Sequence, residues 1–386
     1  MSTQVLVVGA SVGGLTVAEA LRRKGHAGPI TLVGAEPHPP YDRPPLSKEI
    51  LAGDWPDERA FLRDRAQLDA LGAEFVLGRR AERLDAEARK IELDDGRTLS
   101  YDTLVIATGL VPRRLSFQGG LGGVHTLRTL DQARALRAHL LTALNVAVIG
   151  AGVLGCEIAA TARELGLSVT LVDPVPVVMA RQLGDELGAL VAALHVRHGV
   201  QVRTGVGVAG LAGDGGHVSG VELTDGSRVP ADLVVVATGS TPATGWLAGS
   251  GLSIEDGVVC DSRCRAAPGV YAVGDVARWH HERLGGSVRL ENRTNVVQQA
   301  LAVADAIMGA DALYTPIPYF WTDQYDVKLQ IHGTIPPGAR LRPVDGEPGQ
   351  ARFAALAEVD GLAVAAIGWN HPRGVMAARR RLAPQS

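Results

Sequence analysis

The chain has 386 residues, of which 46% are hydrophobic and 20% charged, and its formal net charge at pH 7 is −3. This composition is that of an ordinary globular protein and excludes a disordered or fibrous chain, and the near balance of charge gives no reason to expect nucleic acid or an anionic membrane as a partner. The three cysteines, Cys156, Cys260 and Cys264, fit neither a disulfide scaffold nor a metal site, so we expect buried packing residues and no bound metal.

The first predicted unit begins close to the N-terminus. Val5–Val8 is a short apolar run typical of a parallel strand buried on both faces, and it leads into the glycine-rich turn Gly9–Gly14. A helical pattern follows as far as Gly25, and a second strand over 30–33 is followed by Glu36. Because a strand starts at residue 5, we expect no secretory signal peptide, and no apolar run is long enough to span a membrane. The expected location is cytoplasmic.

The same unit recurs in the middle of the chain. A strand over 146–149 leads into the turn Gly150–Gly155, a helix is predicted over 156–165, and a strand over 169–172 is followed by Asp173. This order of strand, glycine-rich turn, helix, strand and acidic residue is the fingerprint of a dinucleotide-binding unit. The internal repeat therefore predicts two dinucleotide sites in one chain.

The glycines and the acidic residue each have a physical role in such a unit. The first glycine permits the tight turn, the second lets the backbone approach a pyrophosphate, and the third lets the helix pack closely on the strand. The amides of the helix N-terminus and the helix dipole attract the phosphates. Ser11 takes the place of the second glycine in the first turn and is small enough for the same approach. Asp173 favours NADH over NADPH, because a carboxylate repels a 2′-phosphate and no arginine follows directly.

Further segments repeat in parallel. Strands over 104–106 and 233–236 both end in Ala-Thr-Gly, and an Asp-Gly turn typical of a hairpin precedes each. Another strand over 270–273 ends in Gly274 and Asp275. From Tyr314 onward, prolines, clustered aromatic residues and alternating stretches predict a separate small domain.

One string resembles a known family more closely than the repeat alone does. The string Pro40-Tyr41-Asp42-Arg43-Pro44-Pro45-Leu46-Ser47-Lys48 resembles the FAD-binding signature of the ferredoxin reductases of oxygenase systems. Four other segments are similar to the same family: Leu127–Asp131, Gly274–Ala277, Tyr319–Tyr325 and Asn370–Arg373. Together they cover nearly the whole chain.

The resemblance implies an α/β protein with two nested Rossmann-like dinucleotide-binding domains, of the glutathione-reductase type, and a small α+β C-terminal domain. The FAD-binding domain is expected over 1–112 and 240–312, the NAD-binding domain over 113–239, and the C-terminal interface domain over 313–386.

The resemblance also implies roles for individual residues. Glu36 would hold the adenosine ribose of FAD, Arg43, Lys48 and Arg128 would contact FAD, and Asp275 would bond its ribityl chain. Trp321 would lie near the isoalloxazine. Lys48 and Glu157 would pair beside flavin N5, with Glu157 near the nicotinamide; the alternative is that Lys48 only packs against FAD and Glu157 only caps the helix. Lys48, Glu157 and Trp321 are thus the catalytic candidates. The expected cofactor-binding residues are Gly9, Ser11, Gly13, Gly14, Glu36, Arg43, Pro44, Lys48, Ala81, Ala107, Thr108, Gly109, Arg128, Gly274, Asp275, Arg293, Gly150, Gly152, Val153, Leu154, Gly155, Glu157, Asp173 and Gly239.

The chain departs from the family pattern at Arg293, where several members have tryptophan. In the family this position contacts the flavin partly through backbone, so we expect FAD binding to survive. A helix predicted over 294–308 could direct its N-terminal amides at the flavin. Arg293 itself is a candidate contact for the electron acceptor.

The implied function is that of an NADH-dependent ferredoxin reductase. Hydride would pass from NADH to FAD, and single electrons to a [2Fe–2S] ferredoxin that serves a cytochrome P450 or a Rieske oxygenase. The segment 43–48 contains no cysteine, so electrons must leave for an external acceptor. A rubredoxin reductase, an NADH oxidase, and a redox-responsive interaction protein similar to apoptosis-inducing factor stay open as alternatives.

For three polar clusters, a solvated surface is a simpler interpretation than a functional site. His280, His281 and Glu282 are expected in a solvated loop, and His195 with His198 on the surface of a helix. The run 379–381 is expected to be a solvated helix end, with electrostatic steering of an acidic ferredoxin as the alternative.

Overall fold

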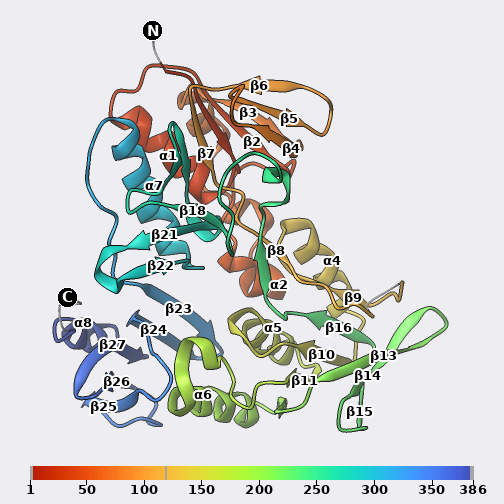
Figure 1. Ribbon diagram of the computed structural model, residues 1–386. Helices are drawn as coiled ribbons and strands as arrows, with labels where there is room; N and C mark the ends of the chain where they lie inside the picture. The colour runs from red at the N-terminus through yellow and green to blue at the C-terminus, as the bar shows by residue number, and fades with distance from the viewer. Residues whose placement is uncertain (1–2, 118–119, 383–386) are drawn as a thin grey trace.

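The computed structural model describes residues 3–117 and 120–382. A largely parallel sheet, a fully parallel sheet and an antiparallel sheet organise the chain (Figure 1). In the ribbon view the first sheet and its helices lie at the top, and the second sheet and the C-terminal sheet lie side by side below. Within the described residues, no helix is both long and apolar enough to cross a membrane.

The first sheet is built from two distant parts of the chain. Its strand order is β19-β20-β7-β1-β2-β3, and every neighbouring pair except β19–β20 is parallel. The strands are β1 (Val5–Val8), β2 (Ile30–Gly34), β3 (Glu74–Leu77), β7 (Thr103–Ile106), β19 (Arg265–Ala267) and β20 (Val270–Ala272). All four residues of β1 are buried, as its apolar run predicts. Helices α1 (Val12–Arg23) and α7 (Arg293–Ile307) pack against each other.

The second sheet lies within the stretch of chain that separates β7 from β20. Its order is β12-β11-β10-β16-β9 and all of its pairs are parallel. The strands are β9 (Val124–His125), β10 (Asn145–Ile149), β11 (Ser168–Asp173), β12 (Gln201–Thr204) and β16 (Leu233–Val236). The helices of this part are α4 (Leu130–Leu140), α5 (Val153–Glu164) and α6 (Ala180–Arg197). The predicted nested arrangement of two dinucleotide-binding folds is confirmed.

The two units match beyond their parallel strands. Each contains a three-stranded antiparallel sheet, inserted before β7 in the first unit and before β16 in the second, whose last turn is the predicted Asp-Gly hairpin. These strands are β4 (Ala81–Asp85), β5 (Lys90–Leu93) and β6 (Thr98–Ser100) in the first unit, and β13 (Val208–Asp214), β14 (His217–Leu223) and β15 (Arg228–Pro230) in the second. The chain crosses between the units twice, and the two crossing strands, β8 (Leu110–Pro112) and β17 (Ser240–Pro242), pair antiparallel.

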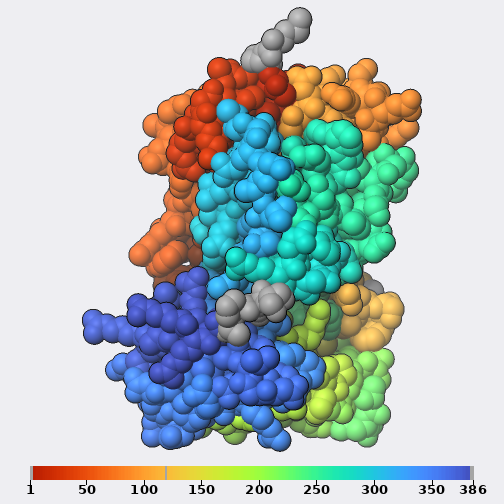
Figure 2. Space-filling model, turned by 60° about the vertical axis from the view of Figure 1, so that its left-hand side comes forward, coloured from red at the N-terminus to blue at the C-terminus, as the bar shows by residue number. Residues whose placement is uncertain are grey.

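The C-terminal domain is an antiparallel sheet with one helix. The order β23-β24-β27-β26-β25 confirms a separate small α+β fold. Its elements are β23 (Tyr319–Gln324), β24 (Val327–Gly333), β25 (Arg340–Asp345), β26 (Phe353–Val359), β27 (Leu362–Trp369) and α8 (Pro372–Arg379). Figure 2 shows this domain, in blue, forming the lower part of one face beneath the returning segment of the first unit, in cyan.

The remaining elements are short. They are α2 (Glu49–Ala52), α3 (Arg65–Ala70), β18 (Val258–Cys260), β21 (Ala277–His281), β22 (Gly286–Val288), and the 3₁₀ helices η1 (Pro44–Ser47), η2 (Asp57–Ala60), η3 (Gly245–Leu247), η4 (Gly274–Val276) and η5 (Glu282–Leu284). The expectation of a solvated loop at His280 and His281 is wrong, because both residues end strand β21. His281 is buried, and its Nε2 lies 2.9 Å from the carbonyl oxygen of Pro316.

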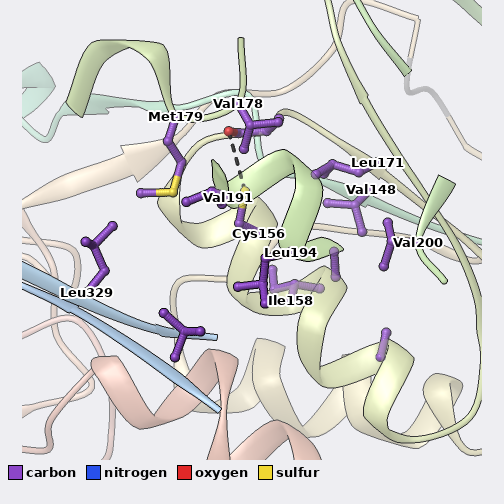
Figure 3. Packing of buried hydrophobic residues seen from close by; sticks show 14 of the residues in the cluster. Val148, Cys156, Ile158, Leu171, Val178, Met179, Val191, Leu194, Val200 and Leu329 are labelled. Atoms are coloured by element: carbon purple, nitrogen blue, oxygen red, sulfur yellow. Dashed lines mark hydrogen bonds between the residues drawn. The ribbon is translucent and has the colours of Figure 1, made fainter. Parts of the chain in front are cut away.

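The largest core cluster joins the second unit to the C-terminal domain. Around Cys156 on α5 it gathers Val148 and Leu171 from the second sheet, Leu194 from α6, and Leu329 from β24 (Figure 3). The Cys156 thiol contacts the carbonyl oxygen of Ala151 at 3.6 Å. All three cysteines are free and buried, which confirms their interpretation as packing residues.

The two glycine-rich turns have the geometry that their roles require. Gly9 and Gly150 have φ of +120° and +108°, which a residue with a side chain rarely adopts. A Cβ on Gly155 would overlap the carbonyl oxygen of Gly150, and one on Gly14 would overlap that of Gly9. The third glycine of each turn is therefore required by close packing between helix and strand.

We predict that substitution by alanine destabilises the protein at one glycine of the second turn and not at another. Gly155→Ala should lower the free energy of unfolding by roughly 1–3 kcal/mol, because the added methyl group has no room. Gly152→Ala should leave it nearly unchanged, because a Cβ there meets nothing within 4 Å. Urea unfolding of both variants measures this, and equal losses of stability would contradict it.

Candidate active site

The two helices that follow the glycine-rich turns have open N-termini. Ser11 and Gly152 occupy the N-cap positions of α1 and α5, neither helix has a side-chain cap, and neither has an acidic residue in its first turn. By contrast, Thr129 caps α4 and Asn292 caps α7 through side-chain hydrogen bonds. Unpaired amides and a positive dipole end suit an anionic group, so both turns fit a pyrophosphate.

The first turn faces a cluster built on Tyr41. The Tyr41 hydroxyl donates to Glu36 Oε2 at 2.5 Å and accepts from Arg43 Nη1 at 2.9 Å and from the amide of Leu130 at 3.0 Å. Arg43 also donates to Glu36 Oε1 at 2.9 Å and to the carbonyl oxygen of Arg128 at 2.6 Å. Burial raises the pKa of Tyr41 to about 12, so it stays protonated. The cluster holds Glu36 and Arg43 at the carboxyl end of β2.

Arg128 and Asp275 form a second pair close to this cluster. Arg128 Nη2 lies 3.4 Å from Asp275 Oδ2, which is long for a charge-assisted hydrogen bond. Burial raises the pKa of Asp275, and burial lowers the pKa of Arg128. A carboxylate in this position benefits from further donors, and the hydroxyl groups of a ribityl chain are such donors.

The other expected FAD contacts lie around these groups. Thr108 Oγ1 donates to the carbonyl oxygen of Ala243 at 2.9 Å, Gly109 has a φ of +67° beside the Arg128 guanidinium, and Gly274 donates its amide to Gln299 Oε1 at 2.7 Å. Ala81 is buried at the start of β4 opposite Leu93. It takes no part in the hydrogen bonds described for the other expected FAD contacts.

Lys48 and Glu157 meet as expected. Lys48 Nζ lies 3.0 Å from Glu157 Oε2, and the two side chains are 16% and 8% exposed. Ser47 Oγ donates to the same oxygen at 2.6 Å, and Thr322 Oγ1 donates to Oε1 at 2.9 Å. One buried carboxylate on α5 thus binds the first unit and the C-terminal domain together. Ser47 and Thr322 lie inside the recognised motifs, but their bonds to Glu157 were not foreseen.

Asp173 sits where the second turn needs an acidic residue. It ends β11, and its two oxygens accept from the amides of Ala151 at 2.6 Å and Val175 at 2.8 Å. The carboxylate is therefore fixed beside the Gly150–Gly155 turn. The carboxylate can still accept a hydrogen bond from a ribose hydroxyl.

The structure places Arg293 in an ion pair and His195 in the core. Arg293 is the first residue of α7 and pairs through Nε with both oxygens of Asp42, at 2.7 and 2.9 Å. Its charge is thus balanced within the chain. The expectation that His195 lies on the surface is wrong, because this residue is fully buried against β23. Trp321 on β23 is partly exposed, and its ring stacks on that of Tyr319 with centroids 6.0 Å apart.

We predict that Lys48→Met lowers the free energy of unfolding by about 3–5 kcal/mol, because it leaves the buried Glu157 carboxylate without its cation. Adding Glu157→Gln should recover part of this loss. The control Lys24→Met breaks a half-exposed pair with Asp305 and should cost less than about 1 kcal/mol. Urea unfolding decides, and a Lys48 variant no less stable than the control would contradict the prediction.

Known proteins are similar to this chain over nearly its whole length. A family model described as pyridine nucleotide-disulphide oxidoreductase matches residues 3–303, and one described as reductase C-terminal matches residues 319–386. The ferredoxin–NAD(+) reductase component of the anthranilate 1,2-dioxygenase system of Burkholderia cepacia is 39% identical, with 98% of this chain and 93% of that protein covered.

Two solved structures extend the likeness to the fold. The ferredoxin reductase for the CYP199A2 system from Rhodopseudomonas palustris has a TM-score of 0.95 at 33% identity, covering 99% of this chain and 96% of that one. The covalent putidaredoxin reductase–putidaredoxin complex gives 0.94 at 32% identity, covering 99% and 93%. This chain therefore belongs to the pyridine nucleotide-disulphide oxidoreductase family, in the group that contains the ferredoxin–NAD(+) reductase components of oxygenase systems.

Proposed function

We propose that the protein is an FAD-dependent NADH:ferredoxin reductase that delivers electrons to a [2Fe–2S] ferredoxin serving a cytochrome P450 or Rieske oxygenase. The observation that carries the proposal is the pair of uncapped helix N-termini, one in each nested unit, with the Lys48–Glu157 pair joining the units between them. The relatives are named for this activity.

FAD is assigned to the first unit and NADH to the second. Glu36 and Arg43 would hold the adenosine end of FAD, and Arg128 and Asp275 the pyrophosphate and ribityl chain. When bound, FAD accepts a hydride from NADH and passes electrons on singly. The chain's contribution is to hold Lys48 as a fixed cation at the junction of the units. There its positive charge would stabilise the negative charge of reduced FAD.

The acceptor must come from outside the chain. A thiol relay of the disulfide-reductase kind needs a reactive cysteine, and burial raises the pKa of Cys156, Cys260 and Cys264. These thiols are buried among apolar side chains and cannot carry electrons outward. A ferredoxin is the acceptor named for the relatives, and we propose that it docks where Tyr319 and Trp321 are partly exposed.

We also propose a cytoplasmic location. NADH, the proposed electron donor, is available in the cytoplasm, and three unpaired cysteines are typical of a reducing compartment.

The proposed function predicts that electron flow from NADH depends on ferredoxin. With the FAD-loaded protein, NADH should reduce cytochrome c rapidly only when a [2Fe–2S] ferredoxin is present. Oxygen consumption at the same rate without ferredoxin would identify an NADH oxidase, and reduction of rubredoxin in preference to ferredoxin would identify a rubredoxin reductase. NADH-driven dimerisation with negligible turnover would favour an interaction protein.

The position of Asp173 predicts a preference for NADH over NADPH. Asp173→Asn removes the charge but keeps one oxygen for a backbone amide. The ratio of kcat/KM for NADH to that for NADPH should fall by roughly tenfold, equal to about 1.4 kcal/mol of discrimination. Steady-state kinetics with both nucleotides measures this ratio. A wild type that prefers NADPH would refute the assignment.

The Arg293–Asp42 pair allows a sharp test of docking. If a ferredoxin competes for the Arg293 guanidinium, Arg293→Gln should slow ferredoxin-dependent turnover, whereas Asp42→Asn should not, because it frees the cation. The wild-type rate should also fall as salt rises, since exposed charges are screened over about 8 Å at physiological ionic strength. Ferricyanide reduction serves as the control. An equal response of both acceptors to Arg293→Gln would exclude a specific docking role.

A further inference from the structure

A buried hydrogen-bond chain runs from Glu157 along one face of the C-terminal strand β23 to His195 on α6 and to Tyr325. Thr322 Oγ1, which donates to Glu157 Oε1, itself lies 3.1 Å from Gln324 Nε2. Gln324 Oε1 lies 2.9 Å from His195 Nε2, and His195 Nδ1 lies 3.1 Å from the Tyr325 hydroxyl. We call Thr322, Gln324 and His195 the relay. All three are buried, with exposures of 2%, 3% and 0%.

The chemistry of the end group fixes the direction of every bond in the relay. The Glu157 carboxylate can only accept, so the Thr322 proton points toward it and the Thr322 oxygen accepts from Gln324. The Gln324 amide nitrogen is thereby committed to Thr322, and its oxygen faces His195. His195 must then carry its proton on Nε2, and its Nδ1 accepts from Tyr325.

The surroundings of His195 support this arrangement. Burial, as the main cause, lowers the pKa of His195 to about 4, so the ring is neutral near pH 7 and has one proton to give. Tyr325 holds a left-handed backbone with φ +54°, which is unusual for an aromatic residue. Its ring stacks on His198 at 3.7 Å between centroids. The end of the relay is thus held from α6 and from the β23–β24 turn together.

We propose that Thr322, Gln324 and His195 are positioning residues that fix the Glu157 carboxylate against Lys48. The proposal rests on the proposed function and assigns it three further residues. Ser47 and Lys48 bind one carboxylate oxygen, and the relay binds the other. Without the relay, the carboxylate can turn about its terminal bond, and the Lys48 ammonium is no longer held in one place.

The first test compares two substitutions of Thr322. Thr322→Val keeps the shape but removes the donor, and it should slow the bleaching of bound FAD by NADH about tenfold in stopped-flow, equivalent to the loss of one hydrogen bond to a charged group. Thr322→Ser keeps the donor and should stay within about twofold of wild type. Equal slowing by Val and Ser would overturn the proposal.

A double-variant cycle separates positioning from a general structural effect. If Thr322 acts through Glu157, then NADH should bleach the FAD of the double variant Thr322→Val with Glu157→Gln no more slowly than the FAD of Glu157→Gln alone. If the two effects multiply, Thr322 acts by another route and the proposal fails. Melting temperature and FAD content of each variant show whether it is folded and loaded.

The second readout does not depend on activity. In ¹⁵N NMR of the protein, His195 should be protonated on Nε2 and not on Nδ1, with His195→Gln identifying its signals among those of the 11 histidines. Thr322→Val should free Gln324 to turn and shift this signal. A proton on Nδ1 in the wild type would overturn the proposal. Failure of NADH to bleach the FAD of the wild type would instead refute the proposed function. The NMR test of the His195 proton would still be valid.

Discussion

A single buried carboxylate connects the three parts of the chain. Glu157 lies on α5 of the second unit, yet the groups that donate to it come from Ser47 and Lys48 of the first unit and Thr322 of the C-terminal domain. A buried carboxylate is costly unless it is paired and hydrogen-bonded. The three parts therefore meet where their donors satisfy this carboxylate.

The alternation of side chains along β23 places two different sets of side chains on its two faces. Thr322 and Gln324 are buried toward α5 and α6, whereas Tyr319 and Trp321, offset by one residue, form a partly exposed aromatic pair on the other face. Because side chains alternate strictly along a strand, a slip of one residue would exchange the two sets. The strand thus joins the proposed acceptor surface to the Lys48–Glu157 pair.

What could be predicted from sequence was local or carried by a motif. The apolar runs at Val5–Val8 and 146–149, together with their glycine turns, predicted the central strand of each dinucleotide-binding unit, because such runs are typical of strands buried on both faces. The Lys48–Glu157 pair was implied by the family resemblance. The Arg293–Asp42 pair and the burial of His195 were not predictable, since each depends on a segment more than 100 residues away that only the tertiary fold brings near.

The claim that Glu157 links three segments is tested most directly by hydrogen–deuterium exchange of the FAD-loaded wild type and the Glu157→Gln variant. Whichever way the glutamine amide turns, the ion pair with Lys48 is lost, and an NH₂ group turned toward Lys48 places a donor against the ammonium. If Glu157 links the three segments, exchange should be faster in peptides covering 44–52, 153–164 and 319–333, with β13–β15 unchanged. Faster exchange confined to 153–164 would contradict it.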